Sequence, residues 1–389
     1  MAKLGELYKI TSGGTPSRTH SEYYEDGTIP WVKTGDLKDK YLFETDEKIS
    51  QLGLENSSAR IYLKNTVLLA MYGATIGATS ILEIDAATNQ ACAAFSPRED
   101  VLPEYLYAFL ESQKDKFIKD AVGGAQPNLS AGYLKNIDFD YPPLEQQTKI
   151  TRTLSQIDEL LFLRKKQLEK LDELVKARFV EMFGDPFEKP KWPLKKLKNF
   201  SENISDGSNI DKAYYQKNGD VLFLRIQNVW SNEFRLEDSV YISTSVNEKY
   251  RSTLLRTGDL LITKIGRYYT KDSSLGRVAV YRGQDGGANY SNNIMGVTLT
   301  KDVLSEYVNI LMNLNSYKQY IRKVSVGGTD KRALSKTIIE DFPIIVPPMK
   351  NQNQFAAFVE RVDQQKQTVQ QSLEKLELMK RALMQEYFG

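Results

Sequence analysis

Hydrophobic residues recur at alternating steps of four and three residues in two long stretches of the chain. A sustained period of about 3.5 residues predicts a helical seam. The two series have the same phase, because adding 205 to the positions of the first series gives the positions of the second. The two Pro-Pro pairs are separated by the same interval, from Pro142 to Pro347 (347 − 142). We therefore predict two long helices, residues 144–184 and 347–389, that pair through a coiled-coil core. Its predicted members are Ile150, Leu154, Ile157, Leu161, Leu168, Leu171 and Val175 in the first helix and Phe355, Val359, Val362, Val369, Leu373, Leu376 and Leu383 in the second.

Both seams also contain basic residues, with Arg164, Arg178, Lys366 and Lys380 at core-type positions. Long basic side chains can lie along an apolar surface and keep their charged ends in water. An alternative is that each helix packs only on its own domain. The matched phase and the absence of internal Gly or Pro favour helices that pair with each other.

Both predicted helices start after a Pro-Pro pair and stop at an aromatic residue followed by Gly. The starts are PPLEQQ at 142–147 and PPMKNQ at 347–352, and the ends are MFG at 182–184 and YFG at 387–389. Proline is tolerated in the first turn of a helix, where its missing N–H would be unpaired anyway. Each helix would contain about 38 residues and extend roughly 57 Å at about 1.5 Å per residue.

The segment before each long helix is also repeated. Residues 104–107 (EYLY) and 306–309 (EYVN) each begin a short helical pattern, and GTIPWVKTGDL at 27–37 resembles GDVLFLRIQNV at 219–229. Residues 65–84 and 257–281 each contain two apolar strand patterns around a Gly-bearing turn. We predict a mixed α/β (α+β) fold with two similar domains, residues 1–143 and, after a linker, 185–346. Their loops differ more than their framework, which suggests one task carried out on two different targets.

Composition excludes several classes of protein. The 389 residues are 41% hydrophobic and 26% charged, which is ordinary for a soluble protein. No apolar run approaches the roughly 18 residues of a membrane-spanning helix, and the N-terminal residues lack the apolar core of a signal peptide. The only cysteine, Cys92, excludes an internal disulfide and fits a reducing cytoplasm. With His20 as the only histidine, neither an HExxH zinc site nor a Cys/His cluster can form.

The formal net charge of +2 hides an asymmetry between the domains. Residues 1–143 contain 14 basic and 20 acidic residues, a formal charge of −6. Residues 192–346 contain 22 basic and 16 acidic residues, a formal charge of +6. The second domain therefore has the charge balance of a polyanion binder, whereas the first does not.

Motifs for nucleotide binding, methyl transfer and nuclease activity are missing. No Gly-Lys pair occurs, so there is no P-loop, and no GxGxxG is present. Asp140-Tyr141-Pro142-Pro143 has the letters of an adenine-methyltransferase motif in the wrong order. Asp-x-Lys occurs at 36–38 and 46–48 without the partner motifs of a PD-(D/E)xK nuclease. We predict no catalytic residue, no metal site and no cofactor bound by this chain.

Polar loops that contain glycine stand at matching places in the two domains. Arg reads guanine bidentately, Asn and Gln read adenine, and Lys and Thr contact phosphates. The candidate DNA-binding residues of the first domain are Ser12, Gly13, Thr15, Ser17, Arg18, Lys33, Thr34, Tyr72, Thr75, Asn89, Gln90, Gln126 and Asn128. Those of the second are Ser208, Lys212, Arg225, Gln227, Asn228, Lys264, Arg267, Tyr268, Tyr269, Lys271, Tyr290, Asn292, Asn293, Lys331 and Arg332. Alternatively, these are simply the polar loops of any α/β domain.

The whole pattern resembles the specificity subunit of type I restriction-modification systems. The resemblance rests on two diverged domains that each end in GG…PP and a long helix, and on KLGELYKITSGGTPSR at 3–18 and LEKLDELVKARFVEMFGDP at 168–186. It implies two target recognition domains that each read one half of a bipartite double-stranded DNA site. It also implies that the helices form an antiparallel coiled coil with pseudo-twofold symmetry, which sets the gap between the half-sites.

The resemblance further implies a cytoplasmic subunit without catalysis of its own. Two methyltransferase (M) subunits would transfer a methyl group from S-adenosylmethionine to adenine, and two restriction (R) subunits would use ATP and Mg. The acidic charge of the first domain is then compatible with DNA binding, because partner subunits would supply much of the phosphate contact. We expect weak, salt-sensitive DNA binding by the isolated chain.

Two other functions remain compatible with the residues alone. One is a scaffold whose coiled coil joins two protein-binding domains. The other is a standalone regulator that binds a bipartite operator. Co-purification separates them, since a methyltransferase partner supports the specificity subunit and a lone DNA-binding dimer supports the regulator.

Overall fold

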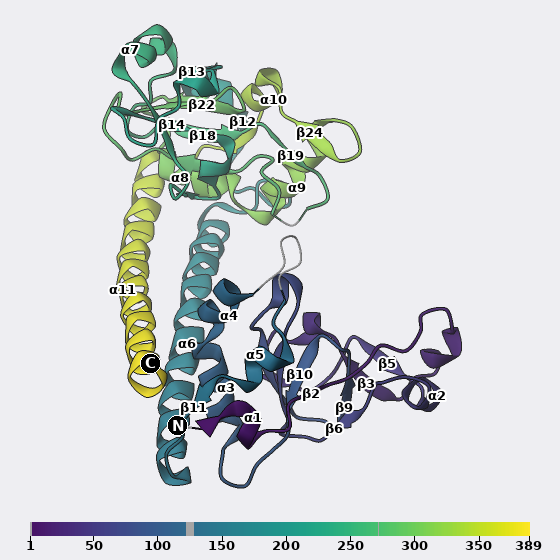
Figure 1. Ribbon diagram of the computed structural model, residues 1–389. Helices are drawn as coiled ribbons and strands as arrows, with labels where there is room; N and C mark the ends of the chain where they lie inside the picture. Colours follow the sequence, from purple (N-terminus) through teal and green to yellow (C-terminus); the bar gives the residue numbers. More distant parts are fainter. Residues whose placement is uncertain (1, 122–127, 271) are drawn as a thin grey trace. The chain divides into compact units, whose positions relative to one another are not determined.

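The structure is a computed structural model that describes residues 2–121, 128–270 and 272–389 (Figure 1). The chain forms two compact units, unit 1 of Met1–Lys165 with Gln371–Gly389 and unit 2 of Lys166–Gln370. Each unit contains one mixed α/β domain and a part of both long helices, α6 (Leu144–Phe183) and α11 (Met349–Phe388). Both helices have 40 residues and begin directly after a Pro-Pro pair.

The first domain contains two sheets and a short strand pair. One sheet has the order β2 (Thr11–Ser12), β10 (Cys92–Phe95), β7 (Val67–Ala70), β8 (Thr79–Leu82), β4 (Tyr41–Leu42). The other has the order β5 (Glu47–Ile49), β3 (Ile29–Val32), β9 (Ala86–Thr88), β6 (Ile61–Tyr62), and β1 (Ala2–Lys3) pairs with β11 (Asp138–Phe139). The helices are α1 (Leu4–Leu7), α2 (Gln51–Glu55), α3 (Pro103–Ser112), α4 (Lys114–Asp120) and α5 (Ala131–Lys135), with 3-10 turns η1 (Ser21–Tyr23), η2 (Thr34–Asp36) and η3 (Gly73–Thr75).

The second domain has the same main sheets and two additions. Its sheets are β13 (Ser201–Asp206), β22 (Ile294–Leu299), β18 (Leu260–Thr263), β20 (Val278–Val280); then β17 (Val240–Ile242), β14 (Val221–Leu224), β21 (Ala288–Tyr290); and the pair β12 (Leu194–Lys196), β25 (Pro343–Ile345). The additions are the pair β15 (Val229–Trp230), β16 (Glu233–Phe234) and the sheet β19 (Ile265–Arg267), β24 (Lys331–Ala333), β23 (Val326–Gly327). The helices are α7 (Thr244–Asn247), α8 (Ser305–Met312), α9 (Asn315–Val324) and α10 (Lys336–Glu340), with 3-10 turns η4 (Leu197–Phe200), η5 (Lys212–Tyr214), η6 (Ile226–Asn228) and η7 (Glu248–Thr253).

The strand orders confirm that the two domains repeat one fold. The order β2-β10-β7-β8 in the first domain corresponds to β13-β22-β18-β20 in the second, and β5-β3-β9 corresponds to β17-β14-β21. In each domain the second sheet contains one parallel pair, β3 with β9 and β14 with β21. The predicted mixed α/β fold with two similar domains and long helices is therefore confirmed.

A buried glutamine joins the first domain to α6. Gln147 accepts a hydrogen bond from the backbone N–H of Leu102 at 2.8 Å. Its amide group donates to the backbone carbonyls of Asp100 at 2.9 Å and Pro142 at 2.8 Å. Because Gln147 is fully buried, these bonds fix the direction in which α6 leaves the domain.

The second domain repeats this joint at α11. Gln352 accepts from the backbone N–H of Leu304 at 2.9 Å. It donates to the backbone carbonyls of Asp302 at 3.1 Å and Pro347 at 2.9 Å, and it is also fully buried. The repeated segments PPLEQQ and PPMKNQ therefore encode one structural device twice, in which the last Gln holds the helix start against its own domain.

In unit 2, the C-terminal part of α6 packs antiparallel against the N-terminal part of α11. Phe179 and Phe183 of α6 lie against Phe355 of α11, with ring centroids 5.4 and 5.5 Å apart. All three side chains are fully buried, and Tyr307 of α8 packs on the same cluster. This aromatic cluster is the place where the helix pair merges with the core of the second domain.

The predicted helical seam needs a correction at this end of α6. The alternating steps of four and three place Arg178 and Met182 in the core, but the fully buried positions are Phe179 and Phe183. A straight α-helix has about 3.6 residues per turn, so a strict 3.5-residue pattern drifts from the true inner face. Among the predicted core residues, Ile150, Leu154, Ile157, Val175, Phe355, Val359, Val362, Val369 and Leu373 are buried, whereas Leu161, Leu168, Leu171, Leu376 and Leu383 are half-buried.

Two lysines at core-type positions of α11 form ion pairs with α6. In unit 1 the Nζ atom of Lys380 lies 2.5 Å from Oδ1 of Asp158. In unit 2 Lys366 pairs with Asp172. Each lysine therefore lies along the helix surface and turns its charged end to an acid of the other helix.

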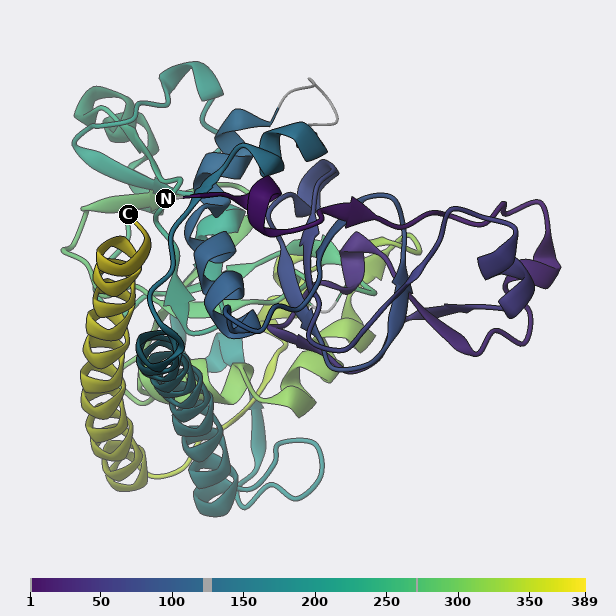
Figure 2. The same cartoon turned by 60° about the horizontal axis from the view of Figure 1, so that its bottom comes forward.

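Both ends of the chain belong to unit 1. Phe388 near the C-terminus packs on Phe109 of α3, with ring centroids 6.2 Å apart, and Phe109 packs on Phe139 of β11 at 4.7 Å. Phe139 is the strand partner of Ala2. Figure 2 shows that, in unit 1, the purple strands and α2 extend away from the blue helices of the domain. The first domain therefore has one part anchored on the long helices and one part remote from them.

The end of α6 needs a glycine for a local reason. Gly184 has a φ of +79°, a conformation that residues with a side chain rarely adopt, and a Cβ atom there would lie 2.0 Å from the carbonyl oxygen of Lys189.

Within the described residues, no helix has a stretch apolar and long enough to cross a membrane.

Candidate nucleic-acid interface

Two parallel strands position the candidate residues in each domain. In the first domain Val32 of β3 stands opposite Thr88 of β9, and in the second Leu224 of β14 stands opposite Tyr290 of β21. Parallel neighbours end at the same edge of a sheet, so the loops that follow them lie side by side. We call this edge and its loops the strand-end surface. It comprises residues 12–18, 33–36, 71–75, 89–91 and 128 in the first domain and 206–208, 225–228, 264–269, 291–293 and 330–334 in the second.

Four backbone hydrogen bonds tie these loops together, and the same four occur in both domains. In the first domain they run from the N–H groups of Gly14, Asn89, Met71 and Leu129 to the carbonyls of Thr88 (2.9 Å), Val32 (2.9 Å), Ala91 (2.8 Å) and Met71 (2.9 Å). In the second they run from Ser208, Ser291, Lys264 and Leu334 to Tyr290 (2.8 Å), Leu224 (2.9 Å), Asn293 (2.9 Å) and Lys264 (2.8 Å). The backbone framework is thus repeated, whereas the side chains that it carries differ.

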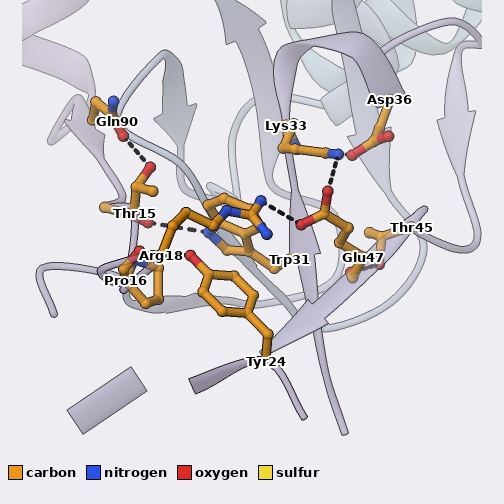
Figure 3. A network of polar contacts seen from close by, with 11 residues as sticks. Thr15, Pro16, Arg18, Tyr24, Trp31, Lys33, Asp36, Thr45, Glu47 and Gln90 are labelled. Carbon is orange, nitrogen blue, oxygen red and sulfur yellow. Dashed lines mark hydrogen bonds and ion pairs between the residues drawn. The ribbon is translucent and has the colours of Figure 1, made fainter. Parts of the chain in front are cut away.

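Figure 3 shows a polar network on the strand-end surface of the first domain. Glu47 of β5 lies 2.6 Å from the Nζ atom of Lys33 and 2.5 Å from an Nη atom of Arg18. Hydrogen bonds from Lys33 and Arg18 hold the pKa of Glu47 below its usual value. The guanidinium of Arg18 also lies over the ring of Tyr24, with Cζ 4.1 Å from the centroid. Both cations therefore have fixed positions.

Two aromatic side chains hold the loop that carries Arg18 in place. Trp31 is almost fully buried and donates its indole N–H to the carbonyl of Gly14 at 3.1 Å. The hydroxyl of Tyr24 donates to the carbonyl of Pro16 at 2.6 Å. These two aromatic residues hold the loop against the second sheet (Figure 3).

The rest of the first-domain surface continues along the same edge. Tyr72 and Asn128 form an isolated antiparallel bridge, and both side chains are exposed. Thr15 donates to Gln90, which lies beside Asn89. The structure therefore brings together candidate residues from five separate segments of the first domain.

In the second domain, Asp238 holds the residues at the end of β14. An Nη atom of Arg225 lies 3.5 Å from Oδ2 of Asp238 and also donates to its backbone carbonyl. Gln227 donates its amide to Oδ2 at 3.1 Å. A hydrogen bond from Gln227 and the nearby charge of Arg225 lower the pKa of Asp238. Arg225 thus occupies the place of Lys33, and Asp238 pairs with it as Glu47 pairs with Lys33. The two acids differ in register, since Glu47 stands opposite Trp31 whereas Asp238 comes two residues before Val240, the partner of Phe223.

A second basic group follows β18. Lys264 pairs with Asp206, and Arg267 on the added strand β19 lies 3.6 Å from Oδ2 of Asp330. The guanidinium of Arg332 lies over the ring of Tyr268 at 5.0 Å from the centroid. Tyr269 beside it is 78% exposed. This combination of exposed aromatic and basic side chains is typical of nucleic-acid surfaces.

Four predicted contact residues are buried and are removed from the set. Asn228 is fully buried and donates to the carbonyl of Arg235 and to Asp238. Ser208 bonds to Thr253, and the hydroxyl of Tyr290 bonds to Ser205 at 2.8 Å. Burial raises the pKa of Tyr290 to about 12. Gly13 is buried, and a Cβ atom there would lie 1.9 Å from the carbonyl oxygen of Thr88. These residues support the loops and do not face outward.

The remaining candidates are placed as follows. Gln126 and Lys271 lie outside the described residues. The exposed or half-buried candidates are Ser12, Thr15, Ser17, Arg18, Lys33, Thr34, Tyr72, Thr75, Asn89, Gln90, Asn128, Lys212, Arg225, Gln227, Lys264, Arg267, Tyr268, Tyr269, Asn292, Asn293, Lys331 and Arg332. Lys212 lies on η5, outside the segments that define the strand-end surface.

The sequence analysis missed the acidic residues that hold the cations of the strand-end surface. Glu47 follows Lys33 by 14 residues, and Asp238 follows Arg225 by 13 residues. In both domains the acid lies in or just before the strand that pairs antiparallel with the strand of the cation. The two spacings are similar but not equal, and this similarity was present in the sequence. Within the described residues, no group of three or more His, Cys, Asp and Glu side chains is placed to hold a metal ion.

Comparison with known proteins gives one consistent family. The model of the type I restriction modification DNA specificity domain matches residues 1–173 and 189–378. The chain is 27% identical over 380 residues to the type I restriction enzyme MjaIX specificity subunit of Methanocaldococcus jannaschii, which covers 92% of this chain and 85% of that protein. It is 22% identical over 361 residues to the EcoKI specificity subunit of Escherichia coli, which covers 88% of this chain and 76% of that protein.

Solved structures share the fold. A chain from a structure on complex assembly and conformational transition of the type I R-M system matches with a TM-score of 0.65 and 16% identity, covering 100% of this chain and 96% of that chain. The S subunit of a type I restriction-modification system from M. genitalium matches with a TM-score of 0.52 and 13% identity, covering 100% and 95%.

Proposed function

Because the chain belongs to the type I restriction modification DNA specificity domain family, we propose that each of its domains recognises one half of a bipartite double-stranded DNA target. The chain supplies sequence recognition to a larger complex and has no catalysis of its own. The strand-end surfaces of the two domains are the parts that contact the DNA.

One observation carries this proposal. The two domains repeat four backbone hydrogen bonds at the strand-end surface but present different side chains beside them, such as the exposed Tyr72 in the first domain and the exposed Ile265 in the second. A repeated frame with unlike side chains is what two readers of different base sequences require, since base edges are distinguished by their donors and acceptors. The cations on both surfaces supply attraction to DNA.

The long helices act as the spacer and as the docking site for partner subunits. A helix of 40 residues extends roughly 60 Å at about 1.5 Å per residue, which exceeds one DNA turn of about 34 Å. Two methyltransferase subunits bind S-adenosylmethionine and methylate adenine, and two restriction subunits bind ATP and Mg. Those cofactors belong to the partners.

Exchange of one domain tests the proposal. Residues 192–346 are replaced by the equivalent segment of another family member. The methylated sequence is then determined in a host strain that has no other DNA methyltransferase. The recognised bases should change in one half-site and stay unchanged in the other. A change in both half-sites, or in neither, contradicts the division of the target between the two domains.

A binding experiment tests the role of the partners. We expect the isolated full chain to bind duplex DNA weakly and with strong salt dependence, because the first domain is acidic overall. Addition of methyltransferase subunits should tighten binding. Nanomolar binding by the isolated chain at physiological salt would contradict this division of labour.

A further inference from the structure

Lys33 and Arg225 occupy the same position in the two domains. Lys33 directly follows β3 and Arg225 directly follows β14, and each of these strands is the first strand, in chain order, of the parallel pair in its domain. Each uses its backbone N–H to bond a side chain three residues on, Lys33 to Asp36 at 2.8 Å and Arg225 to Asn228 at 3.0 Å. A 3-10 turn, η2 or η6, follows in both cases. The Cα atom of each cation is therefore fixed by the same local backbone structure.

Each of these cations is also held at its charged end. The side chain of Lys33 is 31% exposed and meets Glu47, and that of Arg225 is 22% exposed and meets Asp238. Glu47 holds Arg18 in addition. A neighbouring carboxylate weakens the contact of a cation with a DNA phosphate, because phosphate binding depends on net positive charge.

A fixed pair of cation and carboxylate suits the edges of bases. Lys and Arg donate to the O6 and N7 atoms of guanine, and Glu and Asp accept from the N4 amino group of cytosine. The carboxylate cancels part of the positive charge and so weakens attraction to any phosphate, whichever sequence carries it. Donors of the cation that the carboxylate does not use remain available to a matching base.

We propose that Lys33 and Arg225 are the equivalent base-reading residues of the two half-sites, and that Glu47 and Asp238 position them while weakening attachment to the DNA backbone. This inference rests on the proposed function and adds the residues that determine specificity. Glu47 and Asp238 are positioning residues, since they act through the cations that they hold.

The first experiment measures binding to duplex DNA of random sequence by fluorescence anisotropy, with the full chain, at KCl concentrations from about 50 to 200 mM. The variants are E47Q and D238N. Two controls remove one carboxylate charge elsewhere: D138N, whose acid pairs with Lys3 at 2.6 Å, and D341N, whose acid pairs with Lys196 at 2.9 Å.

We expect E47Q and D238N to bind random DNA several-fold more tightly than the wild type. Their slope of log affinity against log salt should steepen by about one unit for each cation released, so by up to about two for E47Q. The controls should change binding less and leave the slope nearly unchanged. If E47Q and D238N match the controls or bind more weakly, the positioning role is overturned.

The second experiment measures sequence preference by selection from a duplex library. K33Q replaces the cation with an amide, which reads adenine instead of guanine, so it should alter the preferred bases in one half-site only. R225Q should alter the other half-site only, and melting curves of both variants check that they fold. Unchanged preferences in both variants would overturn the assignment of the base-reading residues. If the wild type selects no bipartite sequence at all, the proposed function itself fails, which is a separate outcome.

Discussion

The two domains of this chain differ most where their backbones agree most. The strand orders, the four hydrogen bonds of the strand-end surface and the glutamine joint are repeated. On that frame the first domain carries two cations held by one carboxylate, Glu47, whereas the second carries Arg225, Lys264 and the basic residues of the added sheet β19-β24-β23. Formal charges of −6 and +6 express the same difference over the whole domains.

This comparison separates two kinds of constraint. Buried backbone N–H and C=O groups of these loops must have hydrogen-bond partners, so the loop framework tolerates little change. Side chains that point outward from such a framework are free to vary without loss of stability. A repeated frame with variable side chains is therefore a physical basis for changing a recognised sequence without changing the fold.

The largest expected effect compares Phe183 with Phe388, which stand 205 residues apart in the repeat (388 − 183). Phe183 is fully buried in an aromatic cluster, whereas Phe388 is half-buried against Tyr105 and Phe109. We expect F183A to lower the free energy of unfolding by about 3–5 kcal/mol. F388A should cost about 1–2 kcal/mol, because less apolar surface is lost. Urea unfolding of the full chain measures both, and equal losses would contradict the different burial.

The glutamine joint should respond equally in both domains. Q147L and Q352L each remove three hydrogen bonds and leave buried backbone groups without partners, so each should cost about 2–4 kcal/mol. The exposed neighbours Gln146 and Gln354 provide matched controls, and Q146L and Q354L should be nearly neutral. Thermal unfolding separates the four variants. A strong effect in one domain only would show that the joint is not equivalent.

A smaller effect concerns the added sheet β19-β24-β23 of the second domain. Arg267 on β19 lies 3.6 Å from Asp330, whereas Arg18 of the first domain is held more closely, by Glu47 at 2.5 Å and by the ring of Tyr24. We expect R267Q to weaken binding of all duplex sequences alike and to reduce the salt slope by about one. R18Q should change the slope less, because its charge is already offset by Glu47. Anisotropy titrations at several salt concentrations test this, and a reversed order of the two slopes would contradict it.

The smallest effect is a pH dependence confined to the first domain. Hydrogen bonds from Arg98 and then Tyr141 lower the pKa of Asp100 to about 2. A carboxylate whose folded-state pKa is depressed stabilises the fold above its unfolded pKa, and this contribution is lost as pH falls through about 2. D100N should therefore reduce the melting temperature slightly at neutral pH, because the group is exposed and solvent screens it. The difference from wild type should shrink between about pH 4 and pH 2.

The control for that experiment is D302N at the equivalent position of the second domain. Its neighbours at the places of Arg98 and Tyr141 are Thr300 and Val346, which carry no charge or phenol group. Melting curves of both variants over the same pH range provide the comparison. A difference between D100N and wild type that persists at about pH 2 would assign the effect to a cause other than ionisation.

Several features of the fold follow from local patterns and could be predicted from the sequence. The Pro-Pro starts and the 3.5-residue period gave the long helices, and the matched segments gave two similar mixed α/β domains. The prediction was less accurate at Phe179 and Phe183, because a heptad count assumes a supercoiled helix throughout. It also assigned Asn228 and Tyr290 to the DNA surface, since polar side chains in loops look alike whether they point inward or outward.

The sequence alone determined the repeat, the helix phase and the charge asymmetry, because each of these is a property of spacing and composition. Only the tertiary structure decided which loop residues share a surface and which acids hold which cations. Glu47 reaches Lys33 and Arg18 because β5 pairs with β3, and the register of that pairing is not visible in the sequence pattern. The two glutamines show the same limit, since Gln147 and Gln352 looked like ordinary helix residues until their buried partners were known.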